Sequence, residues 1–221
     1  MPTAVFDVNE TLLDLRVLDA PFQDALGAAD ARAQWFQQLL ELAFTCVATD
    51  AYTDFGTLAR AALRMCADRE RVTLDRAAMD RLLGRLRRLP PHAEVPAALQ
   101  SLHAAGWQLL ALSNGTPEAL QAQLRHAGLA PLFAGIVSVD EARQLKPGPK
   151  PYRLVTERYA IDPAAAYFVA AHVWDLAGAR RAGYQTVFVQ RAGKVPNPLD
   201  ASHALAAPSL MSLAEALLDR S

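Results

Sequence analysis

After residue 95, short apolar runs alternate with segments of helical periodicity, and this alternation restricts the fold more than any other feature of the sequence. The apolar runs, one of which precedes the alternation, lie at 3–8, 107–114, 135–139, 166–171 and 185–190. The helical segments lie at about 95–105, 116–127, 151–160, 174–182 and 209–219. Continuous apolar runs are typical of strands buried on both faces. The pattern therefore predicts an α/β fold with a Rossmann-like, doubly wound parallel sheet.

About seventy residues without a strand separate the first apolar run from the others. Residues 17–89 follow the helical period, and the prolines of "PPHAEVP" at 90–96 end it. The helical runs lie at 31–50, 54–69 and 73–89. We therefore expect a core domain of residues 1–14 and 92–221, with an all-helical cap of residues 15–91 inserted after the first strand.

Composition and charge exclude several classes of function. The chain has 221 residues, 52% hydrophobic and 20% charged, with a net charge of -1, so it is typical of a globular protein without attraction to nucleic acid or anionic lipid. The basic run at 81–92 lacks interleaved aromatic residues, which favours a solvated helix face over a nucleic-acid site.

Cys46 and Cys66 lack metal-ligand spacing and are expected to be free thiols. Because we find no signal segment and no membrane-spanning run, we expect a cytoplasmic protein.

Polar side chains follow the predicted strands at their carboxyl ends, the edge where parallel α/β sheets bind ligands. Asp7 ends the first strand, and on its own it could be a nucleophile, a metal ligand or a cap of the next turn. The other polar residues expected at this edge are Ser113, Asn114, Lys146, His172 and Asp175. Because several such groups are expected together, a functional site is favoured over chance capping.

Four segments resemble, in order, the motifs of the haloacid dehalogenase-like superfamily, and the resemblance covers nearly the whole chain. They are "DVNETL" with Asp7 and Thr11, "LLALSNG" with Ser113, "LKPGPKPY" with Lys146, and "FVAAHVWD" with Asp175. The resemblance implies that Asp7 is the nucleophile, that Thr11 orients it, and that the helical insertion is a small cap. A carboxylate nucleophile must be aimed and kept ionised, which a nearby lysine and the hydroxyls of Thr11 and Ser113 can do.

The sequence differs from the superfamily's magnesium-dependent phosphatases at two positions, and both differences favour a dehalogenase over a phosphatase. Those enzymes use an aspartate two residues after the nucleophile to protonate the leaving group, and a pair of acids to bind magnesium. Asn9 and Ala171 stand at these positions. Because a halide leaves without a proton, the resemblance narrows to the type II 2-haloacid dehalogenases. It implies a metal- and cofactor-free hydrolysis of short 2-haloalkanoic acids, such as haloacetate and 2-halopropionate, through an aspartyl ester.

The resemblance also implies a set of substrate-binding residues. Asn114 contributes to the halide or carboxylate pocket, and Tyr152 supports the active-site network. Phe55 lines the substrate pocket, or packs only within the cap core. Phe36 stands where the resembled enzymes carry an arginine that helps withdraw the halide. We expect Asn9 and Asn114 to offer neutral donors instead.

His172 lies where the resembled enzymes offer serine and asparagine near the hydrolytic water. It could act as a base for ester hydrolysis, hold the water that Asp175 activates, or simply pack at the strand end. Two other functions stay open: a magnesium-dependent phosphatase that uses Asp7 and Asp175, and a non-catalytic member of the fold. The expected partners are a haloacid, a halide ion and, through apolar stripes of the cap helices, a second copy of the chain. No nucleic-acid or membrane partner is expected.

Overall fold

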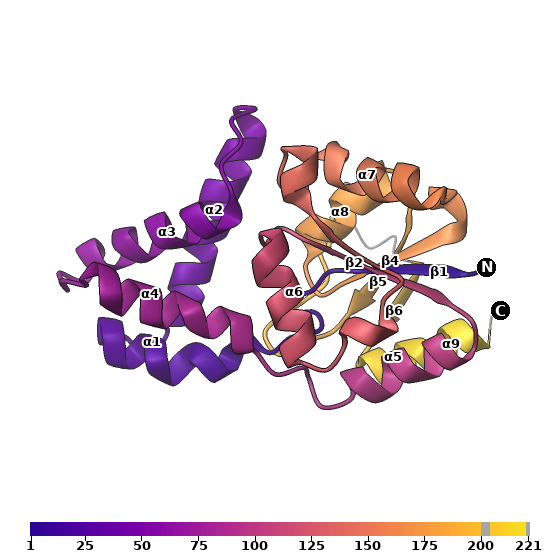
Figure 1. Ribbon diagram of the computed structural model, residues 1–221, viewed down its shortest axis with the longest axis horizontal. Coiled ribbons are helices and arrows are strands. Elements are labelled where there is room, and N and C mark those ends of the chain that lie inside the picture. The colour runs from indigo at the N-terminus through magenta and orange to yellow at the C-terminus, as the bar shows by residue number, and fades with distance from the viewer. Residues whose placement is uncertain (200–203, 220–221) are drawn as a thin grey trace.

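Six parallel strands form one sheet in the order β3-β2-β1-β4-β5-β6 (Figure 1). The strands are β1 (Thr3–Phe6), β2 (Gln108–Ser113), β3 (Gly135–Ser138), β4 (Ala166–Ala170), β5 (Gln185–Val189) and β6 (Leu205–Ala207). The chain winds outward from β1 in both directions, so the strand order reverses between β1 and β4, where doubly wound sheets bind ligands. The predicted α/β, Rossmann-like fold class is confirmed.

This computed structural model describes residues 1–199 and 204–219, so residues 200–203 and 220–221 of the predicted core lie outside it. The strand β6 was not predicted, because its three residues at the sheet edge are too short to show a pattern. Within the described part of the chain, no helix is long and apolar enough to span a membrane.

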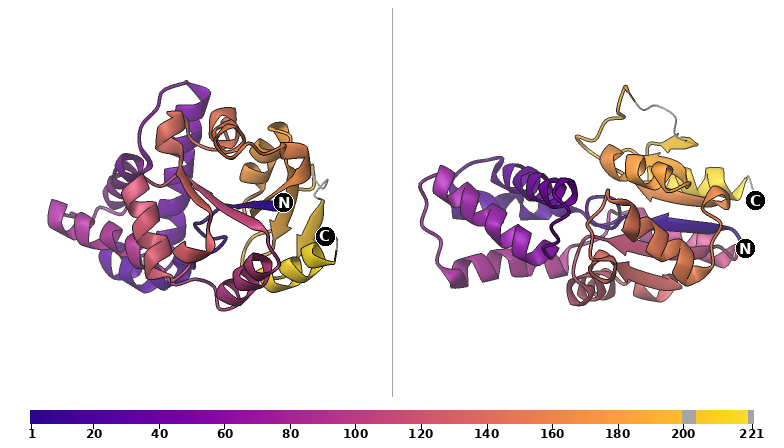
Figure 2. Two further views of the ribbon diagram at one scale, coloured as in Figure 1. Left: turned by 45° about the vertical axis from the view of Figure 1, so that its right-hand side comes forward. Right: turned by 90° about the horizontal axis from the view of Figure 1, so that it is seen from above.

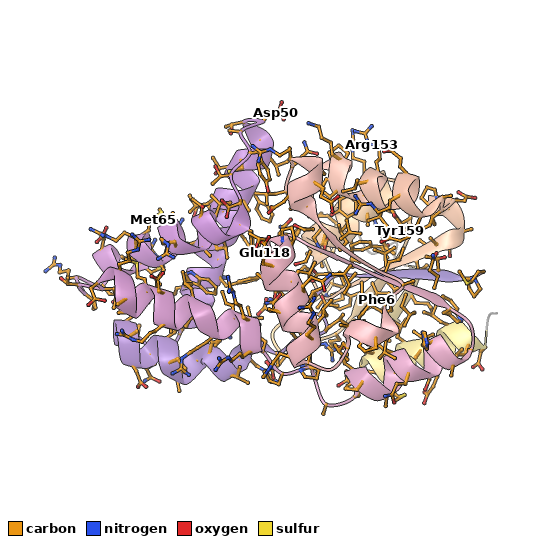
Figure 3. The ribbon with its side chains drawn as sticks, viewed as in Figure 1. Phe6, Asp50, Met65, Glu118, Arg153 and Tyr159 are labelled. Carbon is orange, nitrogen blue, oxygen red and sulfur yellow. The ribbon has the colours of Figure 1, made fainter. Side chains whose placement is uncertain are left out.

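Helices cover both faces of the sheet. In Figure 1, α7 and α8 lie together above the sheet, and α5 and α9 lie together below it. The core helices are α5 (Val95–Ala104), α6 (Pro117–His126), α7 (Pro149–Tyr159), α8 (Val173–Arg181) and α9 (Leu210–Leu218). The short 3-10 turns of the core are η3 (Ala130–Leu132), η4 (Val139–Ala142) and η5 (Pro163–Ala165). The sheet between the helices is apolar, and Phe6 at its centre is fully buried (Figure 3).

Four helices between β1 and β2 form a separate helical lobe, the cap, beside the end of the sheet that lies away from both termini (Figure 2). They are α1 (Asp19–Leu26), α2 (Ala31–Ala48), α3 (Phe55–Arg69) and α4 (Arg76–Gly84), with the 3-10 turns η1 (Leu15–Leu18) and η2 (Arg85–Arg88). The helix expected over 73–89 is shorter, because Asp75 caps its first turn by accepting the Ala78 N–H at 2.6 Å. Its last part is the turn η2.

Two contacts join the cap to the core on opposite sides of the site. On one side, the Tyr52 hydroxyl donates to Asp140 of η4, and the Arg143 guanidinium lies 4.3 Å from the centre of the Tyr52 ring. On the other side, Gln123 of α6 donates to the Leu86 carbonyl of η2 at 2.9 Å. These contacts hold the cap over the carboxyl ends of β1 and β2.

Candidate active site

The loop after β1 aims the carboxylate of Asp7 out of the sheet. The Asp7 N–H continues the strand pairing by donating to the Val169 carbonyl at 3.0 Å. The Thr11 hydroxyl donates to Asp7 Oδ2 at 2.6 Å and accepts the Ala171 N–H at 3.0 Å. Because Thr11 is fixed from both sides, it fixes the orientation of the carboxylate.

Lys146 is a buried cation that joins two carboxylates. Its Nζ lies 2.9 Å from Asp7 Oδ1 and 2.7 Å from Asp175 Oδ2, and it donates to the Leu112 carbonyl at 3.0 Å. The side chain is 1% exposed, so all three ammonium donors are used within the protein. Burial alone would lower the pKa of Lys146, but the two carboxylates raise it. Lys146 is therefore charged near neutral pH.

The two carboxylates beside Lys146 differ in pKa. Burial would raise the pKa of Asp7, but the Lys146 charge, His172 and the Thr11 hydrogen bond hold it well below its usual range. Burial and the nearby Asp7 charge raise the pKa of Asp175, against the opposing effect of Lys146. Tyr152 donates to Asp175 Oδ1 at 2.5 Å. Asp7 is thus the more readily ionised carboxylate of this pair, and Asp175 holds Lys146 in place.

The phosphatases of the superfamily bind a magnesium ion at this position, but the residues of this site are not suited to bind magnesium. All four carboxylate oxygens of Asp7 and Asp175 already accept hydrogen bonds, from Thr11, Lys146 and Tyr152. The ammonium of Lys146 lies between the two acids, where a second cation would be repelled. Ala171 adds no ligand oxygen. Among the described residues, no group of three or more His, Cys, Asp and Glu side chains is placed to hold a metal ion.

His172 bridges Asp7 and a second buried acid, Glu10. Its Nε2 lies 2.9 Å from Glu10 Oε2, and its Nδ1 lies 3.4 Å from Asp7 Oδ2. Lys194 donates to the same Glu10 oxygen at 2.6 Å, and Arg32 donates to the other at 3.2 Å. Burial would lower the pKa of His172, but Asp7 and Glu10 raise it. Despite burial, His172 and Lys194 lower the pKa of Glu10 to about 2.

The backbone at Glu10 is strained. Its φ is 62°, in the left-handed region that an L side chain adopts at a cost of about 1–2 kcal/mol. Strain of this kind persists where the surrounding structure enforces it, and it is common at functional sites. Here the turn presents the Glu10 carboxylate to His172.

A small cavity of about 10 Å³, room for about one water, lies above Asp7. Its lining residues are Asp7, Asn9, Phe36, Leu40, Phe55, Ser113, Asn114, Lys146, His172 and Trp174. The indole Nε1 of Trp174 is buried and has no hydrogen-bond partner among the described residues. The amide oxygens of Asn9 and Asn114 accept from Gln123 and from the Lys146 N–H, which leaves their NH₂ groups as donors. The cavity therefore offers neutral donors to an anion.

All eleven residues predicted for the site converge on this edge of the sheet. Eight line the cavity, and Thr11, Tyr152 and Asp175 lie behind Asp7 and Lys146. One expected contact is not formed in the structure: the Ser113 hydroxyl accepts the Gly115 N–H at 3.1 Å, and no hydrogen bond joins it to the Asp7 carboxylate.

Three further residues were missed: Glu10, Trp174 and Lys194. Two of them had a signal in the sequence, since Glu10 is an acid next to Asn9 and Trp174 is an aromatic residue next to Asp175. Lys194 follows β5 in an irregular segment and has no sequence signal.

Comparison with known proteins places this geometry in a family. The family model described as haloacid dehalogenase-like hydrolase matches residues 1–183. The chain is 32% identical to the (S)-2-haloacid dehalogenase of Pseudomonas sp. strain YL over 86% of this chain and 83% of that protein. It is 33% identical to haloacetate dehalogenase H-2 of Moraxella sp. strain B over 85% of each chain.

The fold agrees with these matches. The L-2-haloacid dehalogenase of Xanthobacter autotrophicus, solved with chloropropionic acid covalently bound, superposes with a TM-score of 0.92 at 25% identity and full coverage of both chains. The matches include all four segments that carry Asp7, Ser113, Lys146 and Asp175. The chain therefore belongs to the haloacid dehalogenase-like hydrolases, in the family of the 2-haloacid dehalogenases.

Proposed function

We propose that the protein is a metal-independent dehalogenase that hydrolyses short 2-haloalkanoic acids through an ester on Asp7. The observation that carries this proposal is an ionised, oriented Asp7 beside a cavity that holds neutral donors, with an amide, Asn9, at the position where the phosphatases have the acid that protonates the leaving group. The relatives named for action on (S)-2-haloacids and haloacetate support the same substrate class.

In the first step, a carboxylate oxygen of Asp7 attacks the halogen-bearing carbon. The new C–O ester bond forms as the carbon–halogen bond breaks, and the halide leaves with the bonding electron pair. Lys146 and Thr11 keep the attacking group ionised and aimed. The Trp174 indole N–H and the amides of Asn9 and Asn114 receive the halide, in place of the arginine that Phe36 replaces.

In the second step, water attacks the Asp7 carbonyl carbon of the ester. Esterification removes the Asp7 charge 3.4 Å from His172 Nδ1, so the pKa of His172 falls and the imidazolium releases its proton. Nδ1 then accepts the proton of the attacking water, while Nε2–H donates to Glu10. The tetrahedral intermediate then collapses: the bond between this carbon and the substrate oxygen breaks, the departing alkoxide takes the proton of the newly added hydroxyl, and the Asp7 carboxylate is restored. The products are the 2-hydroxy acid, the halide and one proton.

His172 is a better base than Asp175 for this water. Both oxygens of Asp175 accept strong donors, Lys146 at 2.7 Å and Tyr152 at 2.5 Å, and its side chain is fully buried. His172 lines the cavity directly. We therefore assign Asp175 and Tyr152 to positioning Lys146.

The predicted division into a core (1–14, 92–221) and a cap (15–91) supports a lid function for the cap. Phe36 and Phe55 of the cap close the cavity above Asp7, which keeps bulk water from the ester. The cytoplasmic location stays a prediction.

We also retain the homodimer as part of the proposal. The helix α2 presents an apolar groove, lined by Leu40, Phe44 and Ala48 among others, that a second copy could cover. Light scattering on the purified protein tests this prediction, and a monomer at all concentrations contradicts it.

A halide-release panel tests the proposed function. We expect turnover of chloroacetate, bromoacetate and at least one enantiomer of 2-chloropropionate, with the same rates in EDTA and in added magnesium. The panel includes p-nitrophenyl phosphate with magnesium as the phosphatase arm. Loss of halide release in EDTA, or turnover of the phosphate ester alone, contradicts the proposal.

The rate at saturating substrate is expected to rise with pH and then level off. His172 must be neutral to accept a proton, so the low-pH limb reports its pKa in the ester intermediate. Glu10 is one of the groups that raise this pKa, so Glu10→Gln is expected to shift the limb to lower pH. Stopped-flow halide release measures both profiles, and a limb that does not move in Glu10→Gln contradicts the role of Glu10.

Restoring the arginine of the relatives is expected to harm this protein. Phe36 is 6% exposed, and its ring centre lies 6.0 Å from both Lys194 Nζ and the His172 ring. Phe36→Arg would bury a third cation there, so we expect a loss of about 3 kcal/mol in the free energy of unfolding and slower halide release. The uncharged control Phe36→Leu is expected to lose only about 1 kcal/mol. Urea unfolding checks both, and a stable, faster Phe36→Arg enzyme contradicts the prediction.

A further inference from the structure

A second and much larger cavity, of about 780 Å³, lies between the cap and α6. It shares three lining residues, Asn9, Phe36 and Phe55, with the small cavity above Asp7. A haloacetate has only a handful of non-hydrogen atoms, whereas cavities of roughly 300–1,000 Å³ bind larger molecules. The site therefore has space for a substrate that extends well beyond the reacting carbon.

The lining of this large cavity carries unpaired positive charge. Arg85, Arg87 and Arg88 of η2 line it, and no described carboxylate lies within ion-pair distance of any of them. A fourth arginine in the lining, Arg60, pairs with Asp80 at 2.6 Å.

The acids of the lining do not neutralise the three arginines of η2. Asp80 pairs with Arg60, and Asp54 caps α3 by accepting the N–H and the hydroxyl of Thr57 at 2.9 and 2.6 Å. The cavity thus favours an anion on its η2 side.

Another part of the cavity lining is apolar. Trp35, Phe36, Leu39 and Phe55 form a wall that continues to the residues around Asp7. A ligand that fits both sides has an aliphatic body along this wall and an anionic end at η2. The planar guanidinium groups match a carboxylate, which they can bind through two hydrogen bonds.

We propose that the preferred substrates are 2-haloalkanedioates, whose second carboxylate is bound by Arg85, Arg87 and Arg88. This inference rests on the proposed dehalogenase activity and names its substrate class. The halogen-bearing end lies at Asp7, the chain passes Phe36 and Phe55, and the far carboxylate reaches η2.

The test compares kcat/KM for halide release from 2-bromoalkanedioates, from butanedioate to octanedioate, with that from 2-bromoalkanoates of the same length. At the length that spans the cavity, the dicarboxylate is expected to be favoured about tenfold, the effect of one good charge-assisted contact. The variant Arg85→Gln/Arg87→Gln/Arg88→Gln is expected to lose this preference and to change kcat/KM for 2-bromopropanoate less than about twofold.

A second triple variant controls for net charge. Arg81→Gln/Arg125→Gln/Arg153→Gln removes three exposed arginines that do not line the cavity; Arg153 lies on α7 of the core (Figure 3). The control is expected to keep the preference for the dicarboxylate. The triple Arg→Lys variant at 85, 87 and 88 keeps the charge and is expected to retain part of the preference for the dicarboxylate.

The outcomes separate this inference from the proposed function. If 2-bromopropanoate is turned over but no dicarboxylate is favoured, the inference is overturned and the dehalogenase stands. The inference is likewise overturned if the preference survives in the Arg→Gln variant at 85, 87 and 88, or if it disappears equally in the control variant at 81, 125 and 153. It is also overturned if the variant at 85, 87 and 88 slows turnover of 2-bromopropanoate as much as that of the dicarboxylates. If 2-bromopropanoate and every other haloacid fail in the wild-type protein, the proposed function itself fails, and the inference with it.

Discussion

Asp7→Asn is expected to lower the rate of halide release from bromoacetate by roughly a thousandfold or more. The amide is neutral and a poor nucleophile, and it cannot replace the carboxylate that Thr11 and Lys146 aim at the substrate. The measurement is the steady-state rate of bromide release at several enzyme concentrations.

A matched control separates chemistry from folding. Asp14→Asn changes a partly exposed acid that pairs with Arg16 at 2.7 Å, outside the site, and is expected to leave the rate within about twofold of wild type. Thermal unfolding of both variants shows whether they are folded. A folded Asp7→Asn protein that keeps a tenth of the wild-type rate contradicts the role of Asp7.

His172→Ala is expected to release halide once and then stall as the Asp7 ester. The first step does not use the imidazole as a base, whereas hydrolysis of the ester does. Removing a general base slows its step by roughly a hundredfold or more, so the ester accumulates. The expected results are a burst of bromide equal to the enzyme concentration and a protein mass increased by one carboxymethyl group.

Two substitutions of Glu10 test the contribution of its carboxylate to the same step. Glu10→Gln keeps the shape, and Glu10→Gly suits the backbone φ of 62° but removes the carboxylate. Both variants are expected to accumulate the ester, but less of it than His172→Ala does. Loss of the Glu10 carboxylate weakens the imidazole as a base, whereas His172→Ala removes the group that accepts the proton of the water. Rapid steady turnover of His172→Ala, with no ester detected, assigns the base to another residue.

Two residues that depart from the resembled enzymes, Phe36 and His172, belong to one connected group with Glu10 and Lys194. Phe36 packs against His172, Lys194 lies over Phe36 and pairs with Glu10, and Glu10 holds His172. An arginine at position 36 would be repelled by the cations already present. An uncharged side chain at position 36 and a histidine at position 172 therefore both fit this arrangement of charge.

The fold and the residues around Asp7 were predictable because each follows from a strand end. The carboxyl ends of parallel strands meet at one edge, so Asp7, Lys146 and Asp175 were expected together, and the structure joins them within 2.9 Å. The expected hydrogen bond from Ser113 to Asp7 is not formed, because the local turn, in which the Ser113 hydroxyl accepts the Gly115 N–H, sets the orientation of the side chain and leaves no pattern in the sequence.

The contacts of Glu10 with His172 and Lys194 could not be predicted, for a different reason. Glu10 reaches His172 only because its backbone adopts a positive φ, which is unusual for a glutamate. Lys194 approaches Glu10 from an irregular segment after β5, 184 residues along the chain. Contacts that depend on loop conformation leave no periodic pattern in the sequence.

The central claim is that Asp7 forms an ester with the substrate, and the position of an oxygen label tests it most directly. The reaction is run for many turnovers in H₂¹⁸O, and the peptide that contains Asp7 is analysed by mass spectrometry. We predict ¹⁸O in the Asp7 carboxylate, together with a first-turnover product whose new hydroxyl oxygen is ¹⁶O from the enzyme. An unlabelled Asp7 peptide, with ¹⁸O in the product of a single turnover, would show direct attack by water and contradict the account.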